Sequence, residues 1–328
     1  MSEKRKILLS GIQPSGTMHI GNYFGAIRQF VEMQDQYDSR VFIADLHAIT
    51  TVQNKEKLSE SILNVAMDYI ACGLDPEKMI LFKQSDAPEV AELAWYFNCI
   101  TTMAYLERAT AYKDANQKAK EVTVGLFDYP MLMAADILIQ DADVVPVGAD
   151  QKQHVEYARD TAQKFNNIYG ETFKIPEPMI LKEVAIVPGT DGRKMSKSYG
   201  NTIPLFGTDE EIKKAVMSIV TDSKTPEDLK DPEVCNIFAL HKLFSNDKEL
   251  KDLRLRYEKG GLGYKESKDM LLAEILAYIG PMREKRKEYE NNPEKVLEIL
   301  KNGREKVRVK IMEKMKEVRK NIGLELYE

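Results

Sequence analysis

The chain has 328 residues, of which 43% are hydrophobic and 30% charged, and its net charge at pH 7 is −5. This length and apolar content suffice for a folded enzyme of roughly two domains and exclude a fibrous or disordered chain. An acidic chain is also a poor candidate for coating nucleic acid indiscriminately. Cys72, Cys99 and Cys235 form no C-x-x-C pair, so the sequence predicts neither a zinc knuckle nor a disulfide framework.

No apolar run reaches the roughly 18 residues that a membrane-spanning helix requires. The apolar run behind the charged N-terminus, residues 7–9, is also too short for the core of a signal peptide. We therefore expect a cytoplasmic protein without a membrane partner.

Short β-rich runs alternate with helical patterns from the N-terminus to about residue 200. Such alternation is typical of a parallel sheet wrapped by helices, so we predict an α/β domain with a Rossmann-like, doubly wound sheet over residues 1–202. The predicted strands are residues 6–10, 40–44, 79–83, 143–147 and 184–187. The predicted helices are residues 19–37, 55–72, 90–101, 126–140 and 151–165.

Helical patterns alone follow, and they predict an all-helical domain over residues 203–328. Its predicted helices are residues 209–220, 237–244, 265–279 and 305–320. The last one carries an apolar stripe, so we expect it to pack against the body with its basic residues outward. Residues 283–320 hold 14 Lys or Arg against 8 Asp or Glu. This local excess suggests contact with a polyanion, although a solvated helix face is the alternative.

Two lysines stand three positions apart in the pentapeptide of residues 194–198, KMSKS, between small loop-forming residues. Such a loop can grip a polyphosphate, although an isolated K-x-x-K is usually a solvated loop. Residues 13–22, QPSGTMHIGN, follow an apolar run and precede a helical pattern, as a strand–loop–helix phosphate site requires. Asn22 stands where a P-loop needs lysine, and no G-x-G-x-x-G follows the first strand. These facts disfavour kinase, GTPase and nicotinamide-dinucleotide sites.

The HIGN of residues 19–22 resembles the HIGH signature of class I aminoacyl-tRNA synthetases, and residues 194–198 match the second signature of that class in full. Within the class, the chain resembles the bacterial tryptophanyl-tRNA synthetases. Asn22 replaces the last histidine, as is usual in that branch, and Ala149 replaces a common glutamate, which leaves Asp150 but puts a role of the glutamate in doubt. The resemblance also rests on GIQPSG at 11–16, GNYFGA at 21–26, DLHAIT at 45–50, YPMLMAADIL at 129–138 and GADQKQHVEYARD at 148–160.

The resemblance implies a reaction in two steps. The carboxylate of L-tryptophan attacks the α-phosphate of ATP and releases pyrophosphate, and the aminoacyl group then passes to the 2′-hydroxyl of the terminal adenosine of tRNA(Trp). The implied cofactors are ATP and Mg²⁺, with the ion held mainly by the ATP phosphates and no metal site on the protein. Catalysis would come from positioning and from positive charge placed where the transition state gains negative charge.

The implied assembly is a homodimer whose interface uses a helical insertion near residues 75–130. The helical domain would bind the anticodon of tRNA(Trp), and we expect Arg304, Arg308 and Arg319 to face the tRNA. DNA is not an expected partner.

The resemblance also assigns the site residues. The implied catalytic residues are His19, Lys194 and Lys197. The implied ATP-binding residues are Gln13, Pro14, Ser15, Gly21, Asn22, Gly148, Ala149, Asp150, Ile186, Lys194, Met195, Ser196, Lys197 and Ser198. The implied tryptophan-binding residues are Asp136, Tyr129, Met133, Gln151, His47, Val147 and Gln13.

Asp136 would accept the indole N–H, because indole is a donor without an acceptor. A carboxylate would also accept a tyrosine hydroxyl, so a tyrosine–tRNA ligase of the same fold stays an alternative. A non-catalytic synthetase-like module that binds tRNA is a third, which the intact lysines and motif histidines oppose. His47 and His154 could equally be pocket walls.

Overall fold

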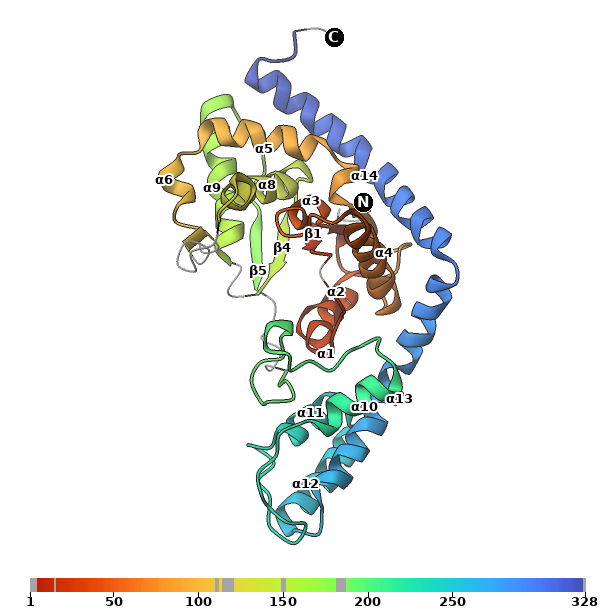
Figure 1. The fold of residues 1–328 in the computed structure, drawn as a ribbon. Helices are drawn as coiled ribbons and strands as arrows, with labels where there is room; N and C mark the ends of the chain where they lie inside the picture. Colours follow the sequence, from red (N-terminus) through yellow and green to blue (C-terminus); the bar gives the residue numbers. More distant parts are fainter. Residues whose placement is uncertain are drawn as a thin grey trace.

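The computed structural model describes residues 5–14, 16–109, 112–113, 121–148, 152–180 and 187–326. These residues form two lobes, one built around a sheet and one of helices alone (Figure 1). The helix at the C-terminal end starts beside the helical lobe and runs along one side of the sheet lobe to its far end. In the described part of the chain, no helix has the length and apolar character needed to cross a membrane.

The sheet has five strands in the order β3-β2-β1-β4-β5, and every neighbouring pair is parallel. The chain therefore adds strands first on one side of β1 and then on the other, which makes the gap between β1 and β4 the topological switch point. Ligands of doubly wound sheets bind at this point, outside the carboxyl ends of the strands. The strands are β1 (Ile7–Ile12), β2 (Asp38–Ile43), β3 (Ile80–Lys83), β4 (Val144–Val147) and β5 (Glu177–Ile180).

The predicted fold class is confirmed, and four of the predicted strands match β1 to β4 within two residues. The sequence did not predict β5, because Pro176 and Pro178 interrupt the β-rich pattern there. Proline is tolerated at the edge of a sheet, and β5 is an edge strand. The strand predicted at residues 184–187 lies outside the described residues apart from Val187, which belongs to no strand.

Each helix predicted in the sheet lobe is present, whereas the short helices α3 and α6 were not predicted and the first predicted helix ends early, at Met33. The single helix predicted over residues 19–37 is divided by a π-helical turn, η1, a local widening that is frequent at functional sites. The elements are α1 (Ile20–Asn22), η1 (Tyr23–Ile27), α2 (Arg28–Met33), α3 (Asp45–Ala48), α4 (Lys55–Ala71), η2 (Gln84–Asp86), α5 (Glu89–Ile100), α6 (Met103–Leu106), α8 (Val124–Ile139) and α9 (Lys152–Tyr169).

The helical lobe contains α10 (Asp209–Met217), α11 (Asn236–Phe244), α12 (Asp247–Lys259) and most of α13 (Tyr264–Glu290). It has a small core of its own made by Phe238, Leu253, Tyr257 and Leu262. The lobe is tied to the sheet lobe through α13, where Arg286 donates from Nε to Asp68 of α4 at 2.5 Å. The aliphatic residues of α13 and α10 continue the core that lies beneath α1, η1 and α4.

The last helix, α14 (Pro293–Ile322), packs against the sheet lobe. Its apolar stripe, Val307, Ile311, Met315 and Val318, is buried in the same cluster as Leu9, Phe42 and Phe82 of the sheet. At Gly303 the helix backbone lies directly on edge strand β3, where a Cβ atom would overlap the Leu81 carbonyl oxygen. The absence of a side chain at this position allows α14 to cover the edge of the sheet.

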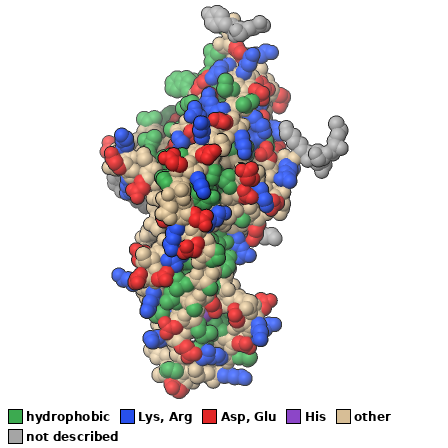
Figure 2. Space-filling model, turned by 90° about the vertical axis from the view of Figure 1, so that its right-hand side faces the viewer, with side chains coloured by type: hydrophobic (Ala, Val, Ile, Leu, Met, Phe, Trp, Pro, Cys, Tyr) green, Lys and Arg blue, Asp and Glu red, His purple; other side chains and the backbone are tan. Residues whose placement is uncertain are grey.

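The basic residues of α14 differ in their surroundings. Arg308, Lys314 and Arg319 are half-buried, whereas the other basic residues between positions 301 and 320 face outward as predicted, namely Lys301, Arg304, Lys306, Lys310, Lys316 and Lys320. Arg308 Nη1 donates to Glu89 at 2.6 Å, and Arg319 makes a bidentate pair with Glu92 at 2.7 and 2.6 Å, both acids belonging to α5. Lys314 pairs with Asp141 at 3.0 Å. Figure 2 shows basic and acidic side chains interspersed over this face. Arg308 and Arg319 therefore hold α14 onto the body, whereas Arg304 is exposed. The contact of this face with tRNA stays a prediction.

We expect Arg319→Glu to destabilise the fold and Glu92→Arg combined with Arg319→Glu to recover part of the loss. The reason is that the pair is bidentate and joins two helices that are distant in sequence. A double-mutant cycle of urea unfolding should give a coupling energy of about 1 kcal/mol, since both side chains are partly exposed. A coupling indistinguishable from zero would mean that the pair has no role in holding α14.

Candidate active site

The loop that follows β1 leads into a helix start built by His19. His19 Nδ1 accepts the backbone N–H of Asn22 at 3.2 Å, and Asn22 Oδ1 accepts the backbone N–H of His19 at 3.1 Å. This reciprocal pair is a capping box, which fixes the chain as it enters α1. The start of a helix preceded by a glycine-containing loop is a site where backbone N–H groups meet phosphate.

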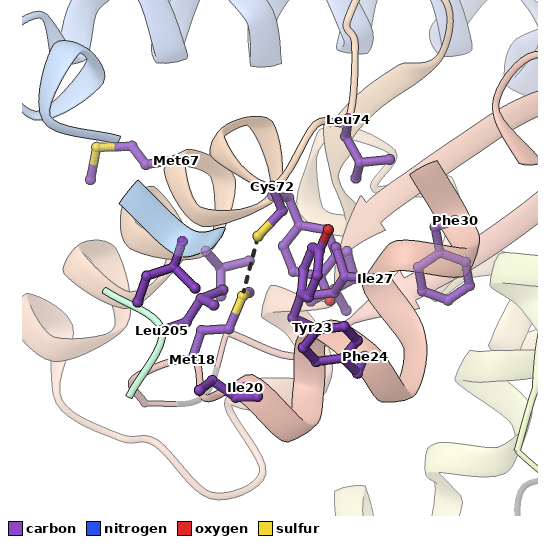
Figure 3. Packing of buried hydrophobic residues seen from close by; sticks show 14 of the residues in the cluster. Met18, Ile20, Tyr23, Phe24, Ile27, Phe30, Met67, Cys72, Leu74 and Leu205 are labelled. Atoms are coloured by element: carbon purple, nitrogen blue, oxygen red, sulfur yellow. Dashed lines mark hydrogen bonds between the residues drawn. The ribbon is translucent and has the colours of Figure 1, made fainter. Parts of the chain in front are cut away.

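The cap is anchored from below by the apolar core (Figure 3). Met18 and Ile20, the neighbours of His19, are buried near Leu205, and the Cys72 thiol donates to Met18 Sδ at 3.8 Å. The backbone of Ile20 also donates to the Ile203 carbonyl at 3.0 Å. The residues just after the KMSKS loop are therefore attached directly to the helix start that carries His19.

The KMSKS loop is shaped by an asparagine that sequence reasoning missed. Asn201 is buried, its Oδ1 accepts the backbone N–H of Ser196 at 2.8 Å, and its Nδ2 donates to the Lys194 carbonyl at 3.2 Å and to Asp191 at 2.6 Å. Ser196 and Ser198 hydroxyls lie 2.9 Å apart. Asn201 carries no charge and belongs to no short motif, so nothing in the sequence pointed to it.

The two distant motifs meet in space. Lys197 lies over Gly16, since a Cβ built at Gly16 would be 3.3 Å from Lys197 Nζ. Gly21 lies equally close to Met195, whose Sδ accepts the Gly21 backbone N–H at 3.3 Å. Residues 16–22 and 194–198 are thus in contact through Lys197 and Met195, and the side chains of Lys194 and Lys197 are exposed. Gln13 is exposed in the connecting loop and Pro14 is buried.

Burial, with a further contribution from Lys197, lowers the pKa of His19 from 6.5 to about 4. His19 is therefore neutral at physiological pH and can serve as both hydrogen-bond donor and acceptor.

We expect the lowered pKa of His19 to make the fold sensitive to acid. Because the folded pKa lies below the unfolded value, its contribution to stability is complete above pH 6.5 and is lost as pH falls toward 4. His19→Asn keeps a capping side chain but cannot titrate. Urea unfolding should show the wild type losing stability relative to this variant over that window. Parallel profiles for the two proteins would contradict the lowered pKa.

A second polar cluster lies at the carboxyl ends of β2 and β3 and on α8. Asp136 is buried, with its Oδ2 3.3 Å from His47 Nε2. Gln84 Nε2 donates to both oxygens of Asp136, at 3.0 and 2.8 Å. Burial raises the pKa of Asp136, while His47 and Gln84 act in the opposite direction. The sequence singled out Asp136 and His47, and it missed Gln84.

Tyr129 forms a neighbouring wall of this cluster. Its hydroxyl lies 2.7 Å from His154 Nε2, and its ring meets the His47 ring edge to face with centroids 6.2 Å apart. Burial raises the pKa of Tyr129 to about 12, so the hydroxyl keeps its proton. Met133 and Val147 are half-buried against the same core. His47 and Tyr129 also line an open cavity of about 490 Å³ with Trp95, Asn98 and Asp128.

Five of the expected ligand-binding residues lie outside the described residues, namely Ser15, Ala149, Asp150, Gln151 and Ile186. Gly148 is the last described residue after β4 and so lies at the switch-point side of the sheet. The remaining expected residues fall into the two groups described above: a cationic loop beside a helix start, and a buried carboxylate beside aromatic walls.

Comparison with known proteins agrees with this arrangement. Residues 1–279 match the family model described as tRNA synthetases class I (W and Y). A tryptophan–tRNA ligase of Fusobacterium nucleatum is 51% identical over 317 residues, which cover 96% of this chain and 97% of that protein.

Two solved structures are similar along nearly the whole chain. The tryptophanyl-tRNA synthetase of Campylobacter jejuni, solved with ADP and tryptophan, has 49% identity and a TM-score of 0.94 and covers 97% of this chain and 100% of its own. The enzyme of Mycoplasma pneumoniae has 30% identity and a TM-score of 0.81, with 97% and 98% covered. With identity at this level over nearly the full length of both chains, the protein belongs to the tryptophan–tRNA ligase branch of the class I aminoacyl-tRNA synthetases.

Proposed function

We propose that this protein is a tryptophan–tRNA ligase, which forms tryptophanyl-adenylate from L-tryptophan and ATP and transfers the tryptophan to the terminal adenosine of tRNA(Trp). The observation that carries the proposal is the meeting of the KMSKS loop with the His19 helix start. The same lobe also holds a buried carboxylate, Asp136, beside aromatic walls. The names of the relatives support the same reaction.

The first step needs the amino acid and the nucleotide held in line. The helix start of residues 19–22 offers backbone N–H groups and a neutral imidazole to the triphosphate, and Lys194 and Lys197 bring positive charge to the departing pyrophosphate. Mg²⁺ would arrive on the ATP phosphates and neutralise part of their charge. The switch point at β1 and β4 supports a nucleotide position between the two motifs.

The amino acid would occupy the pocket at Asp136. Its carboxylate is flanked by donors, which suits a side chain that offers only an N–H. Tyr129, Met133, His47 and Val147 would surround the indole, and Gln13 and Gln151 would hold the amino and carboxylate ends. A tyrosine hydroxyl can also donate to a carboxylate, so the shape of the pocket must contribute to the choice.

The second step brings tRNA to the same site. We propose that the lobe formed by α10 to α13 contacts the anticodon, because it projects away from the sheet and has its own core. The proposal no longer includes Arg308 and Arg319, whose charges are paired within the chain. Since tRNA charging supplies translation, we place the reaction in the cytoplasm.

We propose a homodimer and expect a solution mass of twice the chain's 37.4 kDa. Large apolar side chains are exposed near α5 and the start of α8, with Trp95 66% and Val124 81% exposed. Such a patch is typical of a protein interface. Trp95→Glu should shift the mass toward the monomer in analytical ultracentrifugation. A wild-type monomer that charged tRNA at full rate would overturn the proposed dimer.

Amino-acid-dependent exchange of pyrophosphate into ATP tests the proposed function, because it reports adenylate formation without tRNA. Tryptophan should support exchange, and tyrosine should support it far more weakly. Exchange that is equal with tyrosine would favour the tyrosine ligase instead. Absence of exchange with every amino acid would favour a non-catalytic module.

A further inference from the structure

The side chain of Gln84 links the backbone of α3 to the carboxylate of Asp136 in α8. It is the first residue of η2 and is 1% exposed. Its Oε1 accepts the backbone N–H groups of Leu46 and His47 at 3.1 and 3.2 Å, and its Nε2 donates to both oxygens of Asp136. These four hydrogen bonds of one side chain connect α3 with Asp136 of α8.

The orientation of the Gln84 amide follows from these contacts. Two backbone N–H groups can be satisfied only by an oxygen, so Oε1 must face α3. The NH₂ group must then face Asp136, which assigns the two ends of the amide. Gln84 thus presents a fixed donor to the carboxylate.

Asp136 needs such donors to remain ionised while buried, because loss of water favours its neutral form. The groups that face it are Gln84 of η2 and His47 of α3, and Tyr129 of α8 packs against His47. Asp45, whose carboxylate accepts the Ser85 backbone N–H and hydroxyl at 2.9 and 2.5 Å, adds a second negative charge nearby. The carboxylate therefore depends on two side-chain donors against burial and a like charge.

We propose that Gln84 is a positioning residue for amino-acid selection: it holds Asp136 as an oriented, acceptor-only carboxylate toward the indole N–H. A protonated Asp136 would keep only a neutral carbonyl oxygen as acceptor, which binds an N–H more weakly than a carboxylate does, and would add an O–H that an indole cannot accept. Loss of the Gln84 donor therefore weakens tryptophan binding. This inference rests on the proposed function, in which Asp136 receives the indole.

Gln84→Met keeps the size of the side chain but removes both the donor to Asp136 and the acceptor of the Leu46 and His47 N–H groups. At about pH 7 the KM for tryptophan in pyrophosphate exchange should rise about tenfold with little change in kcat, because the donor to both Asp136 oxygens is lost. The pKa of Asp136 should rise further in this variant, so the KM should fall back toward the wild-type value as pH increases to about 9.

In Gln84→Glu the KM for tryptophan should instead rise with pH. The new carboxylate can share one proton with Asp136, so binding survives at low pH and is lost as that proton leaves. A competitor in which sulfur replaces the indole N–H, 3-benzothienylalanine, gives a second readout. The preference of the wild type for tryptophan over this analogue should shrink in Gln84→Met, since only the natural ligand uses the carboxylate.

Gln34 supplies the matched control. It is also buried, its Oε1 accepts the backbone N–H of Asp75 at 2.9 Å, and its Nε2 donates to the Gly73 carbonyl at 3.2 Å, with no carboxylate involved. Gln34→Met should lower the melting temperature without altering the KM for tryptophan or the preference over the analogue.

Failure of the proposed function and failure of the role of Gln84 give different results. Wild-type protein that shows no tryptophan-dependent exchange refutes the proposed function. A wild type that is active but whose Gln84→Met and Gln84→Glu variants keep flat, parallel pH profiles and an unchanged preference refutes the role of Gln84. If Gln84→Met does not fold, the pH dependence of the KM for tryptophan in Gln84→Glu decides alone whether Gln84 has this role.

Discussion

Lys197→Ala should lower the single-turnover rate of adenylate formation by at least about 30-fold, equivalent to about 2 kcal/mol, while changing tryptophan affinity little. Lys197 lies over Gly16 beside the helix start, where negative charge accumulates as pyrophosphate leaves. The surrounding protein lowers the pKa of Lys197 by excluding water, and Asp68 opposes this effect. Lys194→Ala should act in the same direction from the other end of the loop.

The matched control is Lys164→Ala, an exposed lysine of α9 outside both motifs. It should form adenylate at the wild-type rate. If both loop variants also did so, the lysines would be no more than a solvated basic loop, and the transition-state charge would have to be stabilised elsewhere.

Gly303→Ala should destabilise the protein by about 3 kcal/mol or more, although alanine is the better helix former by about 1 kcal/mol. The new Cβ would overlap the Leu81 carbonyl oxygen and lie 2.7 Å from its carbonyl carbon, so α14 must move off β3. Backbone atoms of a sheet cannot yield as a flexible side chain can, and the steric cost therefore exceeds the gain in helix propensity. Urea unfolding measures the difference.

Gly280→Ala in α13 is the comparison, because a Cβ at this position would meet no atom within 4 Å. It should change the free energy of unfolding by less than about 1 kcal/mol. Equal stabilities for the two alanine variants would show that the contact between α14 and β3 is not needed for the fold.

The sheet lobe could be predicted because its strands contain short apolar runs separated by helical periods, as in residues 7–9 and 41–43. The helix α12 was missed because its charged sequence buries only Leu253 and Tyr257, too few residues for a clear period. The strand β5 was missed for another reason, because proline interrupts its β-rich pattern. Local sequence patterns therefore predict the sheet and the helices that cover it, whereas elements with a weak pattern, such as α12 and β5, are found only in the structure.

The site was predictable where chemistry is concentrated in short motifs, as at residues 19–22 and 194–198. Gln84 and Asn201 are single polar residues whose roles depend on hydrogen bonds in the folded chain. Gln84 bonds to Asp136, which lies 52 positions away in the sequence, and Asn201 bonds to Ser196, which lies 5 positions away. The ion pair that the basic end forms with α5 could not be predicted for the same reason. Glu92 of α5 lies 227 positions from Arg319, a neutralisation that local charge counting cannot detect.

Charging of tRNA by the purified full-length chain is the most direct test of its assignment as a tryptophan–tRNA ligase. With ATP and Mg²⁺, labelled tryptophan should become attached to tRNA(Trp) in an acid-stable, alkali-labile ester, and labelled tyrosine should not become attached to tRNA(Tyr). Asp136→Ala should charge tRNA(Trp) much more slowly at low tryptophan concentration, because the indole N–H loses its acceptor. Efficient charging of tRNA(Tyr) with tyrosine, or no charging of any tRNA by a protein that is folded and binds ATP, would contradict the account.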